Sequence, residues 1–109
     1  MGLGFTNRAD KSGPAVYLLS NGTHTSEKEV QALANEITER MHESVQVIAL
    51  DGRRGEGGHV ADFYDVTTLP CVLIVMDDDQ LYHSWMHQLP TAADVSYMAG
   101  QAGARRRGH

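Results

Sequence analysis

Short apolar runs alternate along this chain with longer stretches in which apolar residues recur at helical spacing. Residues 15–19 (AVYLL) and 45–50 (VQVIAL) are apolar runs that end at turn-forming residues, and residues 71–76 (CVLIVM) form the most apolar segment. Runs of this length with such boundaries are typical of buried strands. The pattern predicts three buried strands, and a partner strand over 81–86 that follows the acidic turn 77–79.

The stretches between the apolar runs favour helices. Over residues 27–42 one face is apolar at helical spacing, formed by Val30, Leu33, Ala34, Ile37 and Met41. Ser26 and Glu29 have the spacing of a capping box, which predicts that the helix begins at Ser26. A short helix is predicted over 59–64, and a last helix is predicted from a Thr91 cap to about Ala102.

The order of these elements indicates an α/β fold. A helical crossover between the first two strands implies that they are parallel, and the short connection between the last two implies a β-hairpin. We therefore predict one domain over residues 15–102, a mixed sheet with helices on both faces. Residues 1–14 are predicted to be a loose lead-in, residues 103–109 a flexible basic tail, and residues 51–58 a glycine-rich loop without a phosphate-binding ending.

Composition narrows the classes of function. The 109 residues include 14 acidic and nine basic side chains, a net charge of −5, which is opposite to the basic surface of a nucleic-acid-binding domain. No apolar run is long enough to span a bilayer. We therefore expect no nucleic-acid or membrane partner and a cytoplasmic location. Cys71 is the sole cysteine, so no internal disulfide can form.

Residues 63–70 (FYDVTTLP), followed by the strand at 71–75, resemble the thioredoxin-like superfamily. Together with the strand order, the resemblance covers roughly residues 15–102. It implies a cis peptide bond between Leu69 and Pro70, where the backbone at the edge of a groove pairs with an extended peptide or glutathione.

The resemblance also shows what this chain lacks. It places His24, Thr25, Ser26 and Glu27 at the four positions of the family's CxxC motif, and Leu18 near the position of the buried acid. Since neither cysteine is present, the chain is identified as a member of the superfamily without dithiol exchange activity.

The leading hypothesis is a redox-inactive binding or adaptor module that recognises a protein or peptide partner. The resemblance implies a groove around the suspected cis-proline. Its expected residues are His24, Thr25, Ser26, Glu27, Leu69, Pro70 and His87. We expect no catalytic residue, no bound cofactor and no metal, and the oligomeric state stays open.

Two alternatives belong to other classes. Cys71 could be a reactive thiol in a single-cysteine enzyme or sensor, with glutathione as a co-substrate. His24 and His87, with Glu27 or Cys71, could converge as metal ligands in an accessory protein. A buried cysteine usually behaves as a small apolar residue and groove histidines are usually solvated, so we favour the binding module.

Overall fold

The computed structural model describes residues 13–42, 44–86 and 88–107, with side chains described up to residue 104. Seven elements follow one another along this part of the chain. They are β1 (Ala15–Ser20), α1 (His24–Met41), β2 (Gln46–Asp51), α2 (Gly55–Phe63), β3 (Cys71–Val75), β4 (Leu81–Trp85) and α3 (Ala92–Arg107).

The four strands form one mixed sheet in the order β2-β1-β3-β4. β1 pairs with β2 in parallel and with β3 in antiparallel orientation, so that Leu18 lies between Ala49 and Val72. β3 and β4 form the antiparallel hairpin. The predicted fold class is confirmed: a parallel β-α-β unit is followed by a hairpin and a last helix.

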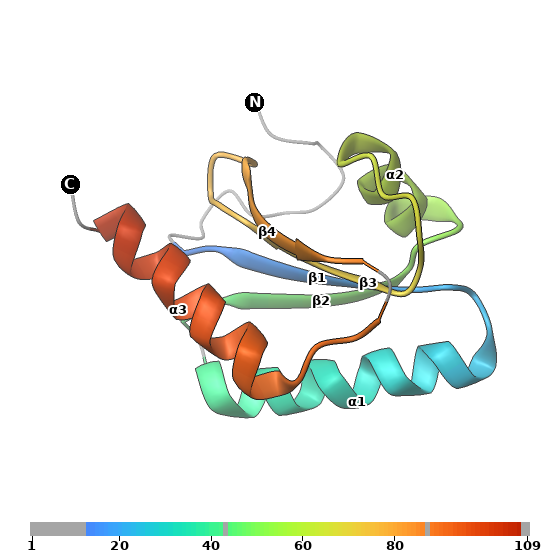
Figure 1. Ribbon diagram of the computed structural model, residues 1–109, viewed down its shortest axis with the longest axis horizontal. Coiled ribbons are helices and arrows are strands. Elements are labelled where there is room, and N and C mark those ends of the chain that lie inside the picture. The colour runs from blue at the N-terminus through green and yellow to red at the C-terminus, as the bar shows by residue number, and fades with distance from the viewer. Residues whose placement is uncertain (1–12, 43, 87, 108–109) are drawn as a thin grey trace.

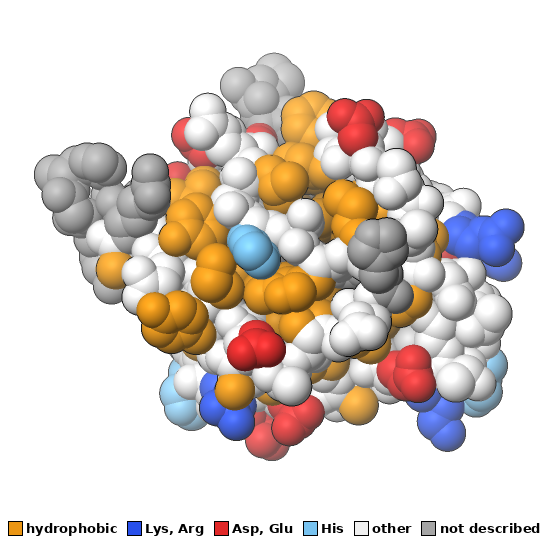
Figure 2. Space-filling view, viewed as in Figure 1, with side chains coloured by type: hydrophobic (Ala, Val, Ile, Leu, Met, Phe, Trp, Pro, Cys, Tyr) orange, Lys and Arg blue, Asp and Glu red, His pale blue; other side chains and the backbone are white. Residues whose placement is uncertain are grey.

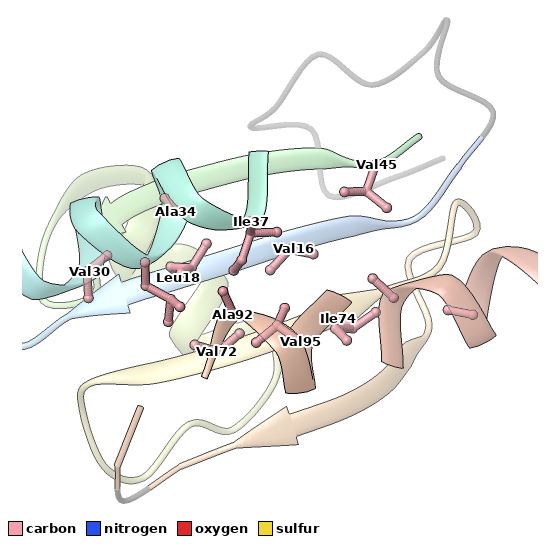
Figure 3. Packing of buried hydrophobic residues seen from close by; sticks show 13 residues of the cluster. Val16, Leu18, Val30, Ala34, Ile37, Val45, Val72, Ile74, Ala92 and Val95 are labelled. Carbon is pink, nitrogen blue, oxygen red and sulfur yellow. The ribbon is translucent and has the colours of Figure 1, made fainter. Parts of the chain in front are cut away.

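Helices cover both faces of the sheet, with α1 and α3 on one face and α2 on the other (Figure 1). Alternate residues of β1 point to opposite faces, because side chains alternate along a strand. Val16 and Leu18 pack with Ile37 of α1 and Val95 of α3 in the larger core (Figure 3). Tyr17 and Leu19 belong to a second core, which includes Val60 of α2.

α1 begins at His24 rather than at Ser26, which corrects the predicted start. The N-cap is Thr23, whose side-chain oxygen accepts a hydrogen bond from the Ser26 backbone N–H at 3.1 Å. The Glu27 backbone N–H donates to the Thr23 carbonyl at 2.9 Å. Ser26 is buried in the first turn, where its hydroxyl accepts a hydrogen bond from the Asn21 backbone N–H at 3.0 Å. A serine with capping-box spacing is therefore a helical residue here.

α2 begins at Gly55, so the second half of the predicted glycine-rich loop is helical. Gly57 lies so close to the end of β2 that a Cβ atom at this position would collide with the Asp51 carbonyl. Glycine normally disfavours a helix, but here it allows the helix backbone to pack directly on the strand backbone. Tertiary packing therefore overrides the local preference.

α3 extends to Arg107, beyond the predicted end at Ala102. Its predicted cap is confirmed, because the Asp94 backbone N–H donates to the Thr91 side-chain oxygen at 3.1 Å. Ala102 is fully buried, and its packing holds the last turns of the helix against the sheet. Residues 103–107, expected in a flexible tail, therefore continue the helix. In the described part of the chain, no helix is long and apolar enough to cross a membrane.

Candidate functional site

The segment that leads into β3 places Leu69 and Pro70 at one end of the sheet. The Leu69–Pro70 peptide bond is cis, the isomer that the family resemblance implied. Directly after Pro70, Cys71 pairs with Leu19 near the end of β1. The Leu69–Pro70 segment therefore lies beside the turn that joins β1 to α1.

A hollow of about 400 Å³ lies at this end of the molecule, on the α2 side. Four segments line it: the turn after β1, the turn after β2, helix α2 and the approach to β3. The lining residues are Asn21, Gly52, Arg53, Ala61, Asp62, Val66, Thr67 and Leu69. Loops after the carboxyl ends of parallel strands are a common place for ligand sites in α/β proteins.

The apolar part of the hollow is a continuation of the second core. Ala61 is buried in that core, and Val66 and Leu69 pack against it while remaining partly exposed. Gly52 makes room for Leu69, because a Cβ at Gly52 would lie 2.7 Å from the Leu69 Cδ2 atom. The same Cβ would lie 3.0 Å from the Cβ of Leu19. The absence of a side chain at Gly52 therefore lets Leu69 close one side of the hollow.

Polar side chains surround this apolar surface. Arg53 and Asp62 are exposed and contribute opposite charges, and Asn21 and Thr67 contribute hydrogen-bonding groups. The Arg53 backbone N–H donates to the Asp51 carboxylate at 2.9 Å, and the same carboxylate pairs with Arg54 at 3.2 Å. Asp51 therefore orders the turn that carries Arg53 to the edge of the hollow.

The structure distributes the predicted site residues over several places. Leu69 lines the hollow, whereas Glu27 lines a smaller hollow of about 200 Å³ beside α1 and β2. His24 and Thr25 are exposed on the first turn of α1 and line neither of these two hollows.

Three further predicted positions have separate outcomes. Ser26 is only 4% exposed and has a structural role in the α1 cap, so it is not available to a ligand. Pro70 is partly exposed beside Leu69 but does not line the hollow, and His87 lies outside the described residues.

Most residues that line the hollow were not predicted from the sequence. The sequence analysis places Gly52 and Arg53 in the glycine-rich loop 51–58, and Ala61 and Asp62 in the short helix 59–64, with no functional role for either segment. The glycines of residues 52–58 were the available signal, because glycine recurs where two backbones approach closely. Which segments approach one another depends on packing between elements, and local sequence does not contain that information.

Cys71 is fully buried at the start of β3. Desolvation by burial raises the pKa of its thiol from 9.0 to about 12. A thiol in this environment has almost no reactive thiolate at neutral pH. Among the described residues, no group of three or more His, Cys, Asp or Glu side chains could hold a metal ion.

Comparison with known proteins supports the architecture. No family model matches the sequence, and no curated protein matches it. Among solved structures, the chain is similar to an uncharacterised thioredoxin-like protein from Clostridium perfringens, with a TM-score of 0.72 and 11% identity. That alignment covers 89% of this chain and 76% of the other.

Two further similar structures are thioredoxins. One is thioredoxin-2 of a malaria parasite, a component of its protein secretion machinery, with a TM-score of 0.66, 10% identity and 82% of each chain covered. The other is the germline-specific thioredoxin Deadhead from Drosophila melanogaster, with a TM-score of 0.64 and 12% identity. That alignment covers 84% of this chain and 82% of Deadhead.

The chain therefore has a thioredoxin-like fold. With one cysteine in its sequence it lacks the CxxC pair on which dithiol exchange depends.

Proposed function

We propose that this protein is a thioredoxin-like binding module that holds a short extended peptide segment in the hollow beside Leu69, without thiol–disulfide exchange. The observation that carries the proposal is the composition of that hollow. An apolar surface made by Ala61, Val66 and Leu69 is bordered by polar groups from other segments.

This combination suits a polypeptide better than a fully apolar ligand. An extended peptide presents backbone N–H and C=O groups that must be hydrogen-bonded on burial, and side chains that need apolar contacts. Asn21 and Thr67 can both donate and accept hydrogen bonds, and Arg53 and Asp62 can pair with charges of either sign. A volume of about 400 Å³ is in the range of small-ligand sites, enough for a short stretch of chain.

The burial of Cys71 argues against the single-thiol alternative. A redox sensor or glutathione-linked enzyme needs an accessible thiolate, whereas Cys71 is fully buried and burial raises its pKa to about 12. The protein should therefore not accelerate the reduction of insulin disulfides by dithiothreitol, with a thioredoxin that contains CxxC as the positive control.

Peptide selection tests the binding function. A phage library of random decapeptides is selected on the wild-type protein, and binding of the selected peptides is followed by NMR of backbone amides. We expect shifts at Asn21, Gly52 and Thr67, and about three- to tenfold weaker binding to an Arg53→Ala, Asp62→Ala variant, because two charged groups at the edge are lost.

Arg54→Ala provides the matched control. Arg54 is next to Arg53 and its side chain is 79% exposed, but it does not line the hollow. The exposed Arg54–Asp51 ion pair contributes little, and the hydrogen bond from the Arg53 backbone N–H to Asp51 remains in this variant, so it should bind the peptides as the wild type does. Equal binding by the Arg53→Ala, Asp62→Ala variant, or a library that yields no peptide, would contradict the proposal.

A further inference from the structure

The turn between β1 and α1 contains the dipeptide Asn21-Gly22. An asparagine can lose its side-chain amide when the backbone nitrogen of the next residue attacks the side-chain carbonyl carbon. Glycine in the next position favours this attack, because no Cβ atom hinders the nitrogen. Of the three asparagines in the sequence, only Asn21 precedes a glycine, and both Asn21 and Gly22 are partly exposed.

The side chain of Asn21 is folded back along the backbone that follows it. Its Oδ1 atom accepts hydrogen bonds from the Thr23 backbone N–H at 3.0 Å and from the Thr23 hydroxyl at 2.7 Å. A side chain that reaches the N–H two residues further on must lie alongside the peptide group between them, which contains the Gly22 nitrogen. The hydrogen bonds therefore hold the two groups that must react on the same side of the turn.

The two donors on Thr23 also bind the atom on which negative charge develops. Attack on the amide carbon turns its oxygen into an oxyanion, and hydrogen-bond donors placed at an oxyanion lower the barrier to such a step. The attacking nitrogen is weakly held, because the Gly22 N–H donates to the Ser20 hydroxyl at 3.4 Å, longer than the usual range. By contrast, the Gly52 N–H in the turn after β2 donates to the Ser20 carbonyl at 3.0 Å.

We propose that Asn21 is a modification site, which deamidates in the folded protein through attack by the Gly22 nitrogen. A bond forms from that nitrogen to Asn21 Cγ, and the bond from Cγ to the side-chain nitrogen breaks. The proton of the Gly22 N–H passes through solvent to the leaving nitrogen, which departs as ammonia, and a succinimide remains. Water then opens the ring at either carbonyl carbon and gives aspartate or isoaspartate. Figure 2 shows uncharged polar side chains and backbone on the surface where β1 leads into α1, so water can reach the turn.

Aspartate at position 21 changes the charge of the hollow beside Leu69. Asn21 lines that hollow together with Arg53 and Asp62, the two charged side chains of its lining. The Arg53 side chain lies next to the turn, because a Cβ at Gly22 would be 3.3 Å from the Arg53 Cδ atom. Deamidation adds a second negative charge beside these groups. The selectivity of the hollow then shifts toward basic peptides, a consequence that rests on the function proposed above.

Mass spectrometry after incubation of the folded protein at mildly alkaline pH tests the modification. Trypsin, which cleaves after Lys and Arg, releases residues 12–28, with Asn21 as the sole side-chain amide, and residues 29–40, which contain Asn35. Asn35, inside α1 and not followed by glycine, is the internal control. We expect the amide-to-acid mass change at Asn21 at least about tenfold faster than at Asn35, because glycine and the Thr23 donors both lower the barrier. The rate should also rise with hydroxide concentration, because the attacking nitrogen must lose its proton.

A matched pair of variants tests the role of the Thr23 hydroxyl. Thr23→Val removes the hydroxyl that donates to Asn21 Oδ1 and should slow deamidation about fivefold, the effect of one hydrogen bond of ordinary strength on a rate. Thr23→Ser keeps a hydroxyl at the same position, and it should deamidate at the rate of the wild type.

Two outcomes would overturn the proposal. One is an unchanged mass of residues 12–28 in the folded protein under conditions in which the protein unfolded in urea deamidates at Asn21. The other is an equal rate in Thr23→Val and Thr23→Ser. The mass measurements involve no peptide ligand, so failure of this proposal is distinguishable from failure of the function proposed above.

Asn21→Asp supplies the aspartate product for measurements of peptide binding. Selected peptides with basic residues should bind this variant about threefold more tightly than they bind the wild type, because one negative charge is added at the exposed edge of the hollow. Unchanged selectivity would contradict the consequence inferred for the hollow.

Discussion

Cys71 and Leu69 lie on either side of Pro70, and their environments differ sharply. Leu69 is partly exposed where it lines the hollow, whereas Cys71, the first residue of β3, is fully buried. The change from accessible to inaccessible takes place over two residues, because β3 enters the middle of the sheet at Cys71. Leu69 lies before β3 and can contact a ligand, whereas Cys71 lies within β3 and cannot.

Burial of the Cys71 thiol makes stability depend on alkaline pH. The pKa of the thiol is raised from 9.0 to about 12 by desolvation in the folded state. A thiol exposed by unfolding ionises first, so the stabilisation is complete below about pH 9 and is lost as pH rises toward about 12. From about pH 8 to about pH 11, the wild type should lose about 2–3 kcal/mol more unfolding free energy than Cys71→Ala.

Urea unfolding at several pH values measures this difference. All other ionisable groups are common to both proteins, so their contributions cancel in the comparison. In parallel, a thiol reagent should label Cys71 slowly in the native protein and rapidly in denaturant. Parallel pH profiles for the two proteins, or fast native labelling at neutral pH, would show an accessible thiol.

Gly52 leaves space for the Leu69 side chain, and a side chain at position 52 should destabilise the protein. In a Gly52→Ala variant the new Cβ would be 2.7 Å from Leu69 Cδ2 and 3.0 Å from the Ser20 carbonyl oxygen. Leu69 must move, and such overpacking typically costs about 1–3 kcal/mol of stability. We also expect peptides selected on the wild type to bind this variant more weakly, because Leu69 lines the hollow.

Gly100→Ala is the matched control for Gly52→Ala. A Cβ at Gly100, which is exposed in α3, would meet no atom within 4 Å. This variant should be more stable than the wild type by about 0.5–1 kcal/mol, since alanine favours a helix over glycine. Thermal unfolding of both variants gives the comparison, and destabilisation by Gly100→Ala would mean that the surroundings of α3 differ from those described.

At the level of the helix, the first turn of α1 is a connected set of hydrogen bonds. Thr23 caps the helix, the Ser26 hydroxyl accepts from the Asn21 backbone N–H, and the Asn21 side chain accepts from Thr23 at 2.7 Å. The resemblance to the thioredoxin-like superfamily places the family's CxxC motif at residues 24–27, in this first turn. In this chain its polar side chains hold the turn that contributes Asn21 to the hollow.

Removing the cap should therefore weaken α1 measurably. Thr23→Ala loses the acceptor for the Ser26 N–H and should cost about 1 kcal/mol, the usual value of an N-cap. Thr25→Ala changes an exposed threonine in the same turn and should have little effect. Urea unfolding of both variants distinguishes the two positions, and equal stability losses would contradict the assignment of Thr23 as the cap.

Over the whole molecule, apolar patterning predicted the order and type of every element. The buried strands at β1 and β3 and the apolar face of α1 depend on periodicity, which is a local property of the sequence. Two of the boundaries that were wrong, the start of α2 and the end of α3, involve packing between elements. Gly57 is helical because α2 rests on the end of β2, and α3 continues because Ala102 is buried.

The candidate site was less predictable than the fold for the same reason. Leu69 could be identified through the family resemblance, but Arg53 and Asp62 come from elements that meet only after folding. Glu27 was expected in the same groove, and it lines a different hollow on the other side of the sheet edge. The family resemblance drew attention to Leu69, which lines the hollow, but it did not identify the other lining residues.

The close packing of Gly57 on Asp51 has a consequence for the thermodynamics of binding. Where backbone rests on backbone, no side-chain rotamer can adjust the spacing, so α2 and the turn after β2 keep a fixed separation. A peptide bound as proposed would meet two walls of the hollow already in place, and the protein would have little conformational freedom to lose there. Affinity at this site should therefore be limited by the ordering of the peptide, and a cyclic peptide held in the bound shape should bind more tightly than its linear form.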